Sequence, residues 1–165
     1  MRIRTFAAAA AATLALTGTA SANTIVDIAA GDDRFSTLVA AVTAAGLAET
    51  LQGPGPFTVY APVNDAFAAL PEGTVDMLLE PENKQQLTDV LLYHVDDRKL
   101  MAAGIPAGSN SFKPVLAGAR LCITKDSSGV SIDDGSGTRA NVVIADIVAD
   151  NGVIHVVDKV LLPGA

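Results

Sequence analysis

Apolar residues recur at helical spacing in the first half of the chain. Two segments carry residues at positions i, i+3, i+4 and i+7, namely Phe35, Leu38, Val39 and Val42, and then Leu87, Val90, Leu91 and His94. This spacing places each set along one face of a helix. Thr24 and either Asp32 or Asp33 are positioned to cap the first two helices, and Gly31 and Gly46 to end them.

The segment between these two helical stripes predicts one strand and more short helices. A Gly-Pro-Gly-Pro run precedes Phe57–Ala61, which has the composition of a short buried strand. Asn64 is then expected to cap a short helix that contains Phe67. Further helical blocks are expected at about residues 74–79 and 82–92.

The second half of the chain has the pattern of short strands. Pieces rich in β-forming residues are expected at about 109–116, 119–125 and 130–133. Two Val- and Ile-rich runs, Asn141–Ala149 and Val153–Leu162, follow and are joined through Asn151 and Gly152. Asn-Gly favours a type I′ turn, in which both central residues have positive φ, so we expect a hairpin with these two residues at its centre. Helices followed by strands, without alternation, indicate one α+β domain.

The first 22 residues have the pattern of a signal peptide. Arg2 and Arg4 precede an apolar stretch from about Phe6 to Leu16, and Ala20-Ser21-Ala22 forms a cleavage pattern. The stretch is too short to span a bilayer, although a retained helical anchor is the alternative. We therefore expect an exported protein, periplasmic or secreted, with its domain at residues 23–165 and no membrane insertion after cleavage.

Charge and cysteine content narrow the classes of partner. Without Arg2 and Arg4, the 11 basic residues fall to 9 against 18 acidic ones, a net charge of −9. Such a surface repels phosphates and anionic headgroups, so nucleic acid and membrane surfaces are not expected as partners. The single cysteine, Cys122, excludes an intramolecular disulfide and is expected to be a buried small hydrophobe, with an intermolecular disulfide as the alternative. We expect a monomer.

Few residues could carry acid–base or metal chemistry. His94 lies on the apolar stripe of its helix, where a hydrogen-bonded core histidine is expected. His155 shares a strand face with Val153, Val157 and Lys159, so we expect it to be partly exposed. A transition-metal site built from two histidines and one cysteine would still need carboxylates. No metal and no cofactor are therefore expected.

Motifs for catalysis or calcium binding are likewise missing from the sequence. Three acidic pairs, Asp32-Asp33, Asp96-Asp97 and Asp133-Asp134, lack the ligand spacing of a calcium loop and are expected to be solvated turn charges. Neither a G-x-S-x-G nucleophile motif nor a glycine-rich phosphate loop occurs. The sequence predicts no catalytic residue and no enzyme.

Three segments, in this order, resemble the fasciclin (FAS1) domain family. Gly55–Phe67 resembles the family's first signature block, Tyr93-His94 its Tyr-His pair, and Asn151–Pro163 its second block. The resemblance covers essentially the whole chain after the leader and is strongest to small exported bacterial members with a single domain. It implies an α+β fold with a compact β-core of about seven strands and helices packed along one side. Val63 departs from the Thr that is usual in the first block.

The resemblance also implies a function and candidate residues for it. It indicates a non-catalytic binding module for cell adhesion or for contact with a protein or extracellular-matrix partner. An apolar small-molecule carrier, for a carotenoid or lipid, is the alternative, because some fasciclin-type proteins bind carotenoids. Candidate binding residues are Tyr93 and His94, together with Asp146 and Ile147, which occupy the place of an integrin-binding Asp-Ile in animal members. Residues expected to have structural roles are Asn64, Phe67, Asn151, Gly152 and His155.

Overall fold

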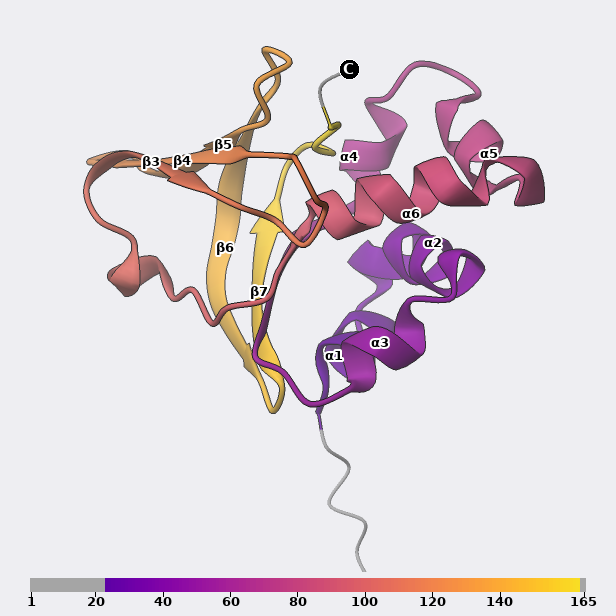
Figure 1. Ribbon diagram of the computed structural model, residues 1–165, viewed down its shortest axis with the longest axis horizontal. Helices are drawn as coiled ribbons and strands as arrows, with labels where there is room; N and C mark the ends of the chain where they lie inside the picture. The colour runs from indigo at the N-terminus through magenta and orange to yellow at the C-terminus, as the bar shows by residue number, and fades with distance from the viewer. Residues whose placement is uncertain (1–22, 164–165) are drawn as a thin grey trace, which may run out of the picture.

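Helices occupy one side of the molecule and strands the other, as the computed structural model shows (Figure 1). It describes residues 23–163, so the expected signal peptide at residues 1–22 lies outside the described residues. Within this part of the chain, no helix is long and apolar enough to cross a membrane. The helices in chain order are α1 (Ile25–Ala30), η1 (Asp33–Phe35), α2 (Ser36–Ala45), α3 (Ala48–Gln52), α4 (Asn64–Ala68), α5 (Thr74–Leu79), η2 (Pro81–Asn83), α6 (Lys84–Tyr93) and η3 (Ala102–Gly104).

Seven strands form one sheet with the order β2-β1-β7-β6-β5-β4-β3. The strands are β1 (Phe57–Pro62), β2 (Val95–Asp96), β3 (Gly108–Phe112), β4 (Leu121–Asp126), β5 (Gly129–Asp133), β6 (Arg139–Ala149) and β7 (Gly152–Val157). Among these strands, only β1 and β7 run parallel, and every other neighbouring pair is antiparallel. The expected α+β fold, with about seven strands and helices along one side, is confirmed.

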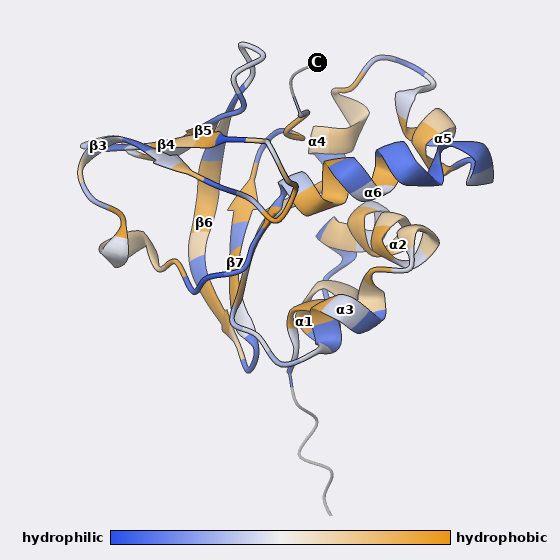
Figure 2. Ribbon diagram, viewed as in Figure 1, coloured by the Kyte–Doolittle hydropathy of each residue, from blue (hydrophilic) through white to orange (hydrophobic). Residues whose placement is uncertain are grey.

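The core has two parts on opposite sides of the central strands. The larger part lies between the helices and strands β1 and β7, and contains Phe35, Leu38 and Ile154. The smaller part lies among β3, β4, β5 and β7 and contains Leu121 and Ile132. All six residues of β7 are buried, because this strand has a neighbour on each edge and packing on each face. Figure 2 shows the resulting apolar character along β6 and β7 and the polar outer face of α6.

The helix ends mostly follow the sequence signals. Thr24 and Asp27 form a reciprocal capping box at the start of α1, and Asp32 caps η1 by accepting from the Arg34 N–H. Gly46 ends α2 in the left-handed conformation, with φ of 73°. A residue with a side chain is strained there, so glycine is favoured at this position.

Asn64 does not cap its own helix, contrary to the expectation. The helix α4 begins at Asn64 itself and has no side-chain cap. The Asn64 side chain instead reaches the start of α2, where its Oδ1 accepts from the Thr37 N–H at 3.1 Å. Its Nδ2 donates to the carbonyl of Asp33 at 2.8 Å and to the Ser36 hydroxyl at 2.9 Å. Asn64 therefore satisfies an N-terminal amide of another helix and fixes α4 against α2.

The tail hairpin is confirmed, but its turn differs from the expected type I′ turn. Ala149 pairs with Gly152, so Asp150 and Asn151 are the two turn residues. Neither Asn151 nor Gly152 has a positive φ. Gly152 is required for another reason, because a Cβ there would lie 1.9 Å from the carbonyl oxygen of Phe57. The close approach of β7 to β1 thus excludes any side chain at this position.

The Asn151 side chain joins three segments that are distant in sequence. Its Oδ1 accepts from the Ile25 N–H at 3.0 Å, at the start of α1. Its Nδ2 donates to the carbonyls of Leu51 and Gly53, at the end of α3. The backbone carbonyl of Asn151 accepts from the Phe57 N–H at 3.0 Å, where β1 begins. The hairpin turn is therefore the point where α1, α3, β1 and β7 are held together.

We predict that Asn151→Ala lowers the free energy of unfolding by about 2–3 kcal/mol, since it leaves three partly buried backbone groups without their partner. Chemical denaturation monitored by circular dichroism measures the loss. Asn110→Ala is the matched control, because Asn110 also donates to two carbonyls but does so at an exposed edge. Equal losses in the two variants would contradict the role assigned to Asn151.

Candidate functional site

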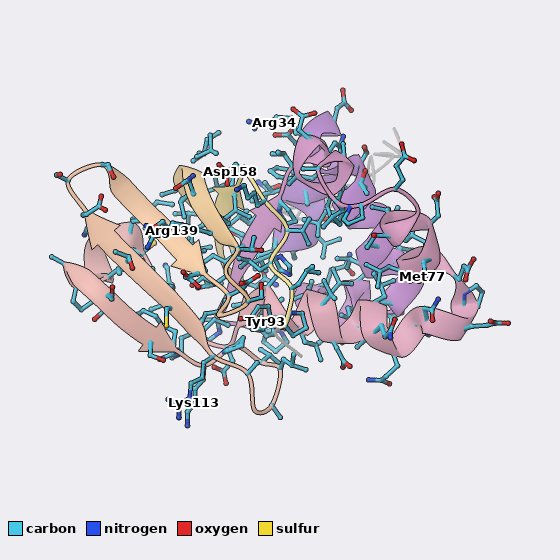
Figure 3. All side chains as sticks on the ribbon, turned by 90° about the horizontal axis from the view of Figure 1, so that it is seen from above. Arg34, Met77, Tyr93, Lys113, Arg139 and Asp158 are labelled. Carbon is cyan, nitrogen blue, oxygen red and sulfur yellow. The ribbon has the colours of Figure 1, made fainter. Side chains whose placement is uncertain are left out.

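Tyr93 and His94, both candidate binding residues, lie inside the protein. They are 1% and 2% exposed, at the end of α6 where the helix meets the sheet. Figure 3 shows Tyr93 between the strands and the helices. A macromolecular partner cannot contact such side chains directly, so any effect of this pair on binding is exerted through the fold.

The surroundings of His94 fix its tautomer. The Leu161 backbone N–H donates to Nε2 at 2.9 Å, so Nε2 carries no proton in the neutral ring. Nδ1 therefore carries the proton and donates to the Val90 carbonyl at 2.7 Å. Burial lowers the pKa of His94 from its ordinary value of 6.5 to about 4. The expected hydrogen-bonded core histidine is confirmed, and it is neutral at pH 7.

Tyr93 holds the loop that carries Asp134, and Asp134, like His94, holds the C-terminal segment. The Tyr93 hydroxyl lies 2.8 Å from the carbonyls of Arg120 and Asp134, to one of which it donates at a time. The Asp134 carboxylate accepts from the Leu162 N–H at 3.1 Å, beside the Leu161–His94 bond. The backbone N–H groups of Leu161 and Leu162, two successive residues after β7, therefore donate to the buried side chains of His94 and Asp134. Burial raises the pKa of Tyr93 to about 12, so its hydroxyl stays protonated.

Two of the acidic pairs are not simply solvated turn charges, contrary to the expectation. Asp134 is buried and accepts at Oδ1 from the N–H and hydroxyl of Ser136 and from the Thr138 N–H. Asp96 is fully buried and pairs with Arg98 at 2.8 Å. The carboxylates are buried because each has enough donors to replace its water. The donors named here lie two to four residues after each carboxylate, and the Leu162 N–H adds a distant one for Asp134.

His155 is also buried, although partial exposure was expected. β7 ends at Val157, so Lys159 lies beyond the strand and does not open its face to water. The Asp146 N–H donates to His155 Nδ1 at 3.2 Å, which places the ring proton on Nε2, facing the Leu100 carbonyl. The ring stacks on Tyr60, with 5.8 Å between centroids. Burial lowers the pKa of His155, as it does for His94.

The candidate residues Asp146 and Ile147 lie at an irregularity of β6. The register between β6 and β7 shifts between Ile144 and Ile147, so β6 contains one extra residue there and bulges. Asp146 has φ of 59°, the one positive φ among the described non-glycine residues. Its Oδ1 accepts from the Ala102 N–H at 2.7 Å, while its own N–H is held by His155. Both Asp146 and Ile147 are half-buried, and the bulge is fixed on two sides.

Beyond Asn141 the exposed residues of β6 are apolar, and the sequence reasoning did not single them out. Val143, Ile144 and Val148, here called the β6 strip, are 62%, 37% and 56% exposed. β5 pairs with β6 only at Arg139–Asn141, and within residues 23–163 no other strand pairs with the rest of that edge. An open edge with β-branched side chains is a template for pairing with another chain. The interrupted β6–β7 register, which exposes these residues, has no local sequence signal.

Cys122 is exposed, so the expectation of a buried thiol was wrong. Leu121 and Ile123 on either side are fully buried. Because successive side chains of a strand point to opposite faces, the residue between two inward ones must point outward.

Within residues 23–163 there is no cluster of metal-ligating side chains, and the apolar cavity behind the first helices is small. No group of three or more His, Cys, Asp or Glu side chains in residues 23–163 is placed to hold a metal ion. One apolar cavity lies between the first helices and β1, lined by Ile25, Leu38, Val42 and Val59 among others, with a volume of about 20 Å³. Pockets for small molecules are usually about 300–1,000 Å³, so this cavity does not accommodate a carotenoid or lipid as it stands.

The chain belongs to the fasciclin family, since the Fasciclin domain model matches residues 33–163. The Synechocystis protein sll1483 is 52% identical over 145 residues, which cover 88% of this chain and 76% of that protein. Transforming growth factor-beta-induced protein ig-h3 of Sus scrofa is 42% identical over 142 residues, covering 86% of this chain and 20% of that protein. The family resemblance expected from three short segments is thereby confirmed.

A solved structure shows the same fold. The FAS1 domain pair from the insect cell adhesion molecule Fasciclin I matches with a TM-score of 0.73 and 18% sequence identity. The match covers 85% of this chain and 51% of that one.

We predict that Tyr93→Phe lowers the free energy of unfolding by about 1–2 kcal/mol, because one buried and one partly buried carbonyl lose their shared donor. Tyr60→Phe is the matched control: Tyr60 is equally buried, but its hydroxyl bonds to no described residue, so the change removes no protein hydrogen bond. Denaturant titration of both variants provides the comparison. A larger loss for Tyr60→Phe than for Tyr93→Phe would overturn the assignment.

As the pH is lowered from 6.5 to about 4, the free energy of unfolding is expected to decrease, because folding lowers the pKa of His94 to about 4. In this window the unfolded chain binds a proton at His94 and the folded protein does not, so acid favours unfolding. Urea titrations at pH 7 and pH 4.5 measure the difference in stability, which should be smaller in His94→Gln. Part of the difference should persist in that variant, since the pKa of His155 is also lowered. An unchanged difference would contradict the burial of a neutral His94.

Proposed function

We propose that the protein is an exported, non-catalytic module for adhesion-type protein contact, and that the β6 strip is its contact surface. The main observation that supports this proposal is the open edge of β6, where Val143 and Val148 are more than half exposed. The family membership supports the same class of function, because the similar insect domain pair comes from a cell adhesion molecule.

The chemistry of the strip defines the partner that it fits. β-Branched side chains favour an extended neighbour, and an unpaired strand edge offers backbone donors and acceptors to it. The partner is therefore an extended, largely apolar segment of another protein at the cell exterior or in the periplasm. Asp146 and Ile147 lie within this stretch, and their bulge sets where regular pairing with such a segment stops.

Rigidity of the surface follows from the buried contacts behind it. His155 holds the Asp146 amide, and the Ala102 amide holds the Asp146 carboxylate. A surface fixed in this way loses less conformational entropy on binding than a mobile loop. Asn151 contributes to binding only by keeping the hairpin in place, and Tyr93 and His94 only by holding the segments around the end of β7.

We predict that a photo-crosslinking residue at position 143 captures one protein partner in the producing organism, whereas one at position 77 does not. Met77 is a matched control, because it is 46% exposed but belongs to α5 on the helical side (Figure 3). The purified partner should bind Val143→Thr/Val148→Thr at least about tenfold more weakly, as expected for loss of central apolar contacts. These substitutions keep β-branching, and circular dichroism verifies the fold. Equal capture at both positions, or unchanged affinity, would refute the proposed surface.

A further inference from the structure

The backbone of Asn23 is held by the tip of the β6–β7 hairpin. Its N–H donates to Asp150 Oδ2 at 2.9 Å, and its carbonyl accepts from the Asp150 N–H at 2.9 Å. Two residues further on, the Ile25 N–H donates to Asn151 Oδ1. Two consecutive turn residues therefore fix the backbone on both sides of Thr24. Figure 1 shows the hairpin tip and the start of the described chain at the same end of the molecule.

We propose that hydrolysis of the Ala22–Asn23 peptide bond places an α-ammonium group on the Asp150 carboxylate, so that removal of the leader adds an ion pair to the fold. Water is added across the peptide bond, which leaves a carboxylate on Ala22 and an amine on Asn23. The amine then takes up a proton and becomes the ammonium group. The bond cut is the one that follows the Ala20-Ser21-Ala22 pattern.

The geometry for this ion pair exists before cleavage. The nitrogen that would carry the charge already lies 2.9 Å from the carboxylate oxygen as an amide donor. Hydrolysis converts a neutral amide with one N–H into an ammonium group with three N–H donors and a positive charge, and charge-assisted hydrogen bonds are stronger than those from neutral donors. No other described residue hydrogen bonds to the Asp150 side chain, so its charge is available to the new terminus.

Other charged groups near the new terminus are less suited than Asp150 to pair with its ammonium group. The Asp27 carboxylate is nearby in sequence but already accepts from the Thr24 N–H and hydroxyl. Lys99 lines the same surface hollow as Asp150 and is the cation that would compete for it. The ammonium group of Lys99 lies at the end of a long side chain with several rotatable bonds. The Asn23 nitrogen instead belongs to a backbone segment that the hairpin turn fixes on both sides of Thr24.

The contact also selects one position of cleavage. A chain that begins one residue earlier or later carries its ammonium group roughly 3.5 Å further along the backbone. That displacement removes the charge from hydrogen-bond distance of Asp150. The inference therefore depends on the export proposed above but not on the β6 strip, and none of the variants below alters the strip.

The first test is the mass of the mature protein. The full-length chain, expressed in a bacterial host that exports it, should be recovered beginning at Asn23. A protein that keeps its leader or begins at another residue would overturn the proposal.

The second test is a double-mutant cycle between the terminus and Asp150. One chain begins at Asn23, and its matched control begins at Ala22, which keeps the Asn23 amide but moves the charge. Thermal unfolding should show a higher Tm for the Asn23 chain, and the difference should disappear in Asp150→Asn. It should also shrink in about 1 M NaCl, where charges are screened within a few ångströms. An equal Tm for the two chains, or a difference that survives Asp150→Asn, would refute the ion pair.

Discussion

The amide side chain of Asn151 is the contact through which the helical half and the strand half of the chain meet. Apolar packing brings helices against a sheet but is not directional, so it does not fix where each chain segment begins. Hydrogen bonds from one amide to α1 and to the end of α3 supply that direction. The neighbouring Gly152 lets β7 approach β1 closely enough for the parallel pairing to form. This junction therefore adds direction to the pairing of β7 with β1 and β6.

A second set of buried polar groups performs the same task at the other end of β7. His94 and Asp134 accept from Leu161 and Leu162, and Tyr93 donates to the loop that carries Asp134. Buried polar groups that are fully bonded specify one arrangement of a core, whereas partly bonded ones are costly. This matters in a chain with a single cysteine, which cannot lock its ends with an internal disulfide. Hydrogen bonds to side chains, rather than covalent links, hold the tail.

The fold was largely predictable from the sequence, because its elements are encoded by local patterns. The stripe through Leu38 and Val42, the Thr24 cap and the tail hairpin are all present in the structure. The errors concern residues whose environment is made by distant segments. Asn64 caps α2 rather than its own helix, and His155 is buried because β7 is central in the sheet. The prediction that Cys122 is buried was wrong for a simpler reason. Its two neighbours in the strand are buried, and because side chains alternate between the two faces, Cys122 must point outward.

The candidate contact surface was predictable only in part. The family resemblance pointed to Asp146 and Ile147, which do lie in the relevant stretch of β6. It did not identify Val143 or Val148, whose exposure depends on where β5 ends and how β6 bulges. Alternation alone would turn half of such an apolar strand inward, so its composition does not indicate which side chains reach the surface.

The parallel pairing of β1 with β7 has a consequence for the order of folding. Phe57 must find Gly152, and most of the chain separates them, so this pairing closes a very long loop. The sheet lacks the interior strand β7 until the last part of the chain is available, so neither half of the core is complete before then. Contacts of such long range make folding slow. The topology therefore delays completion of the core until residues 152–157 are available to pair with β1.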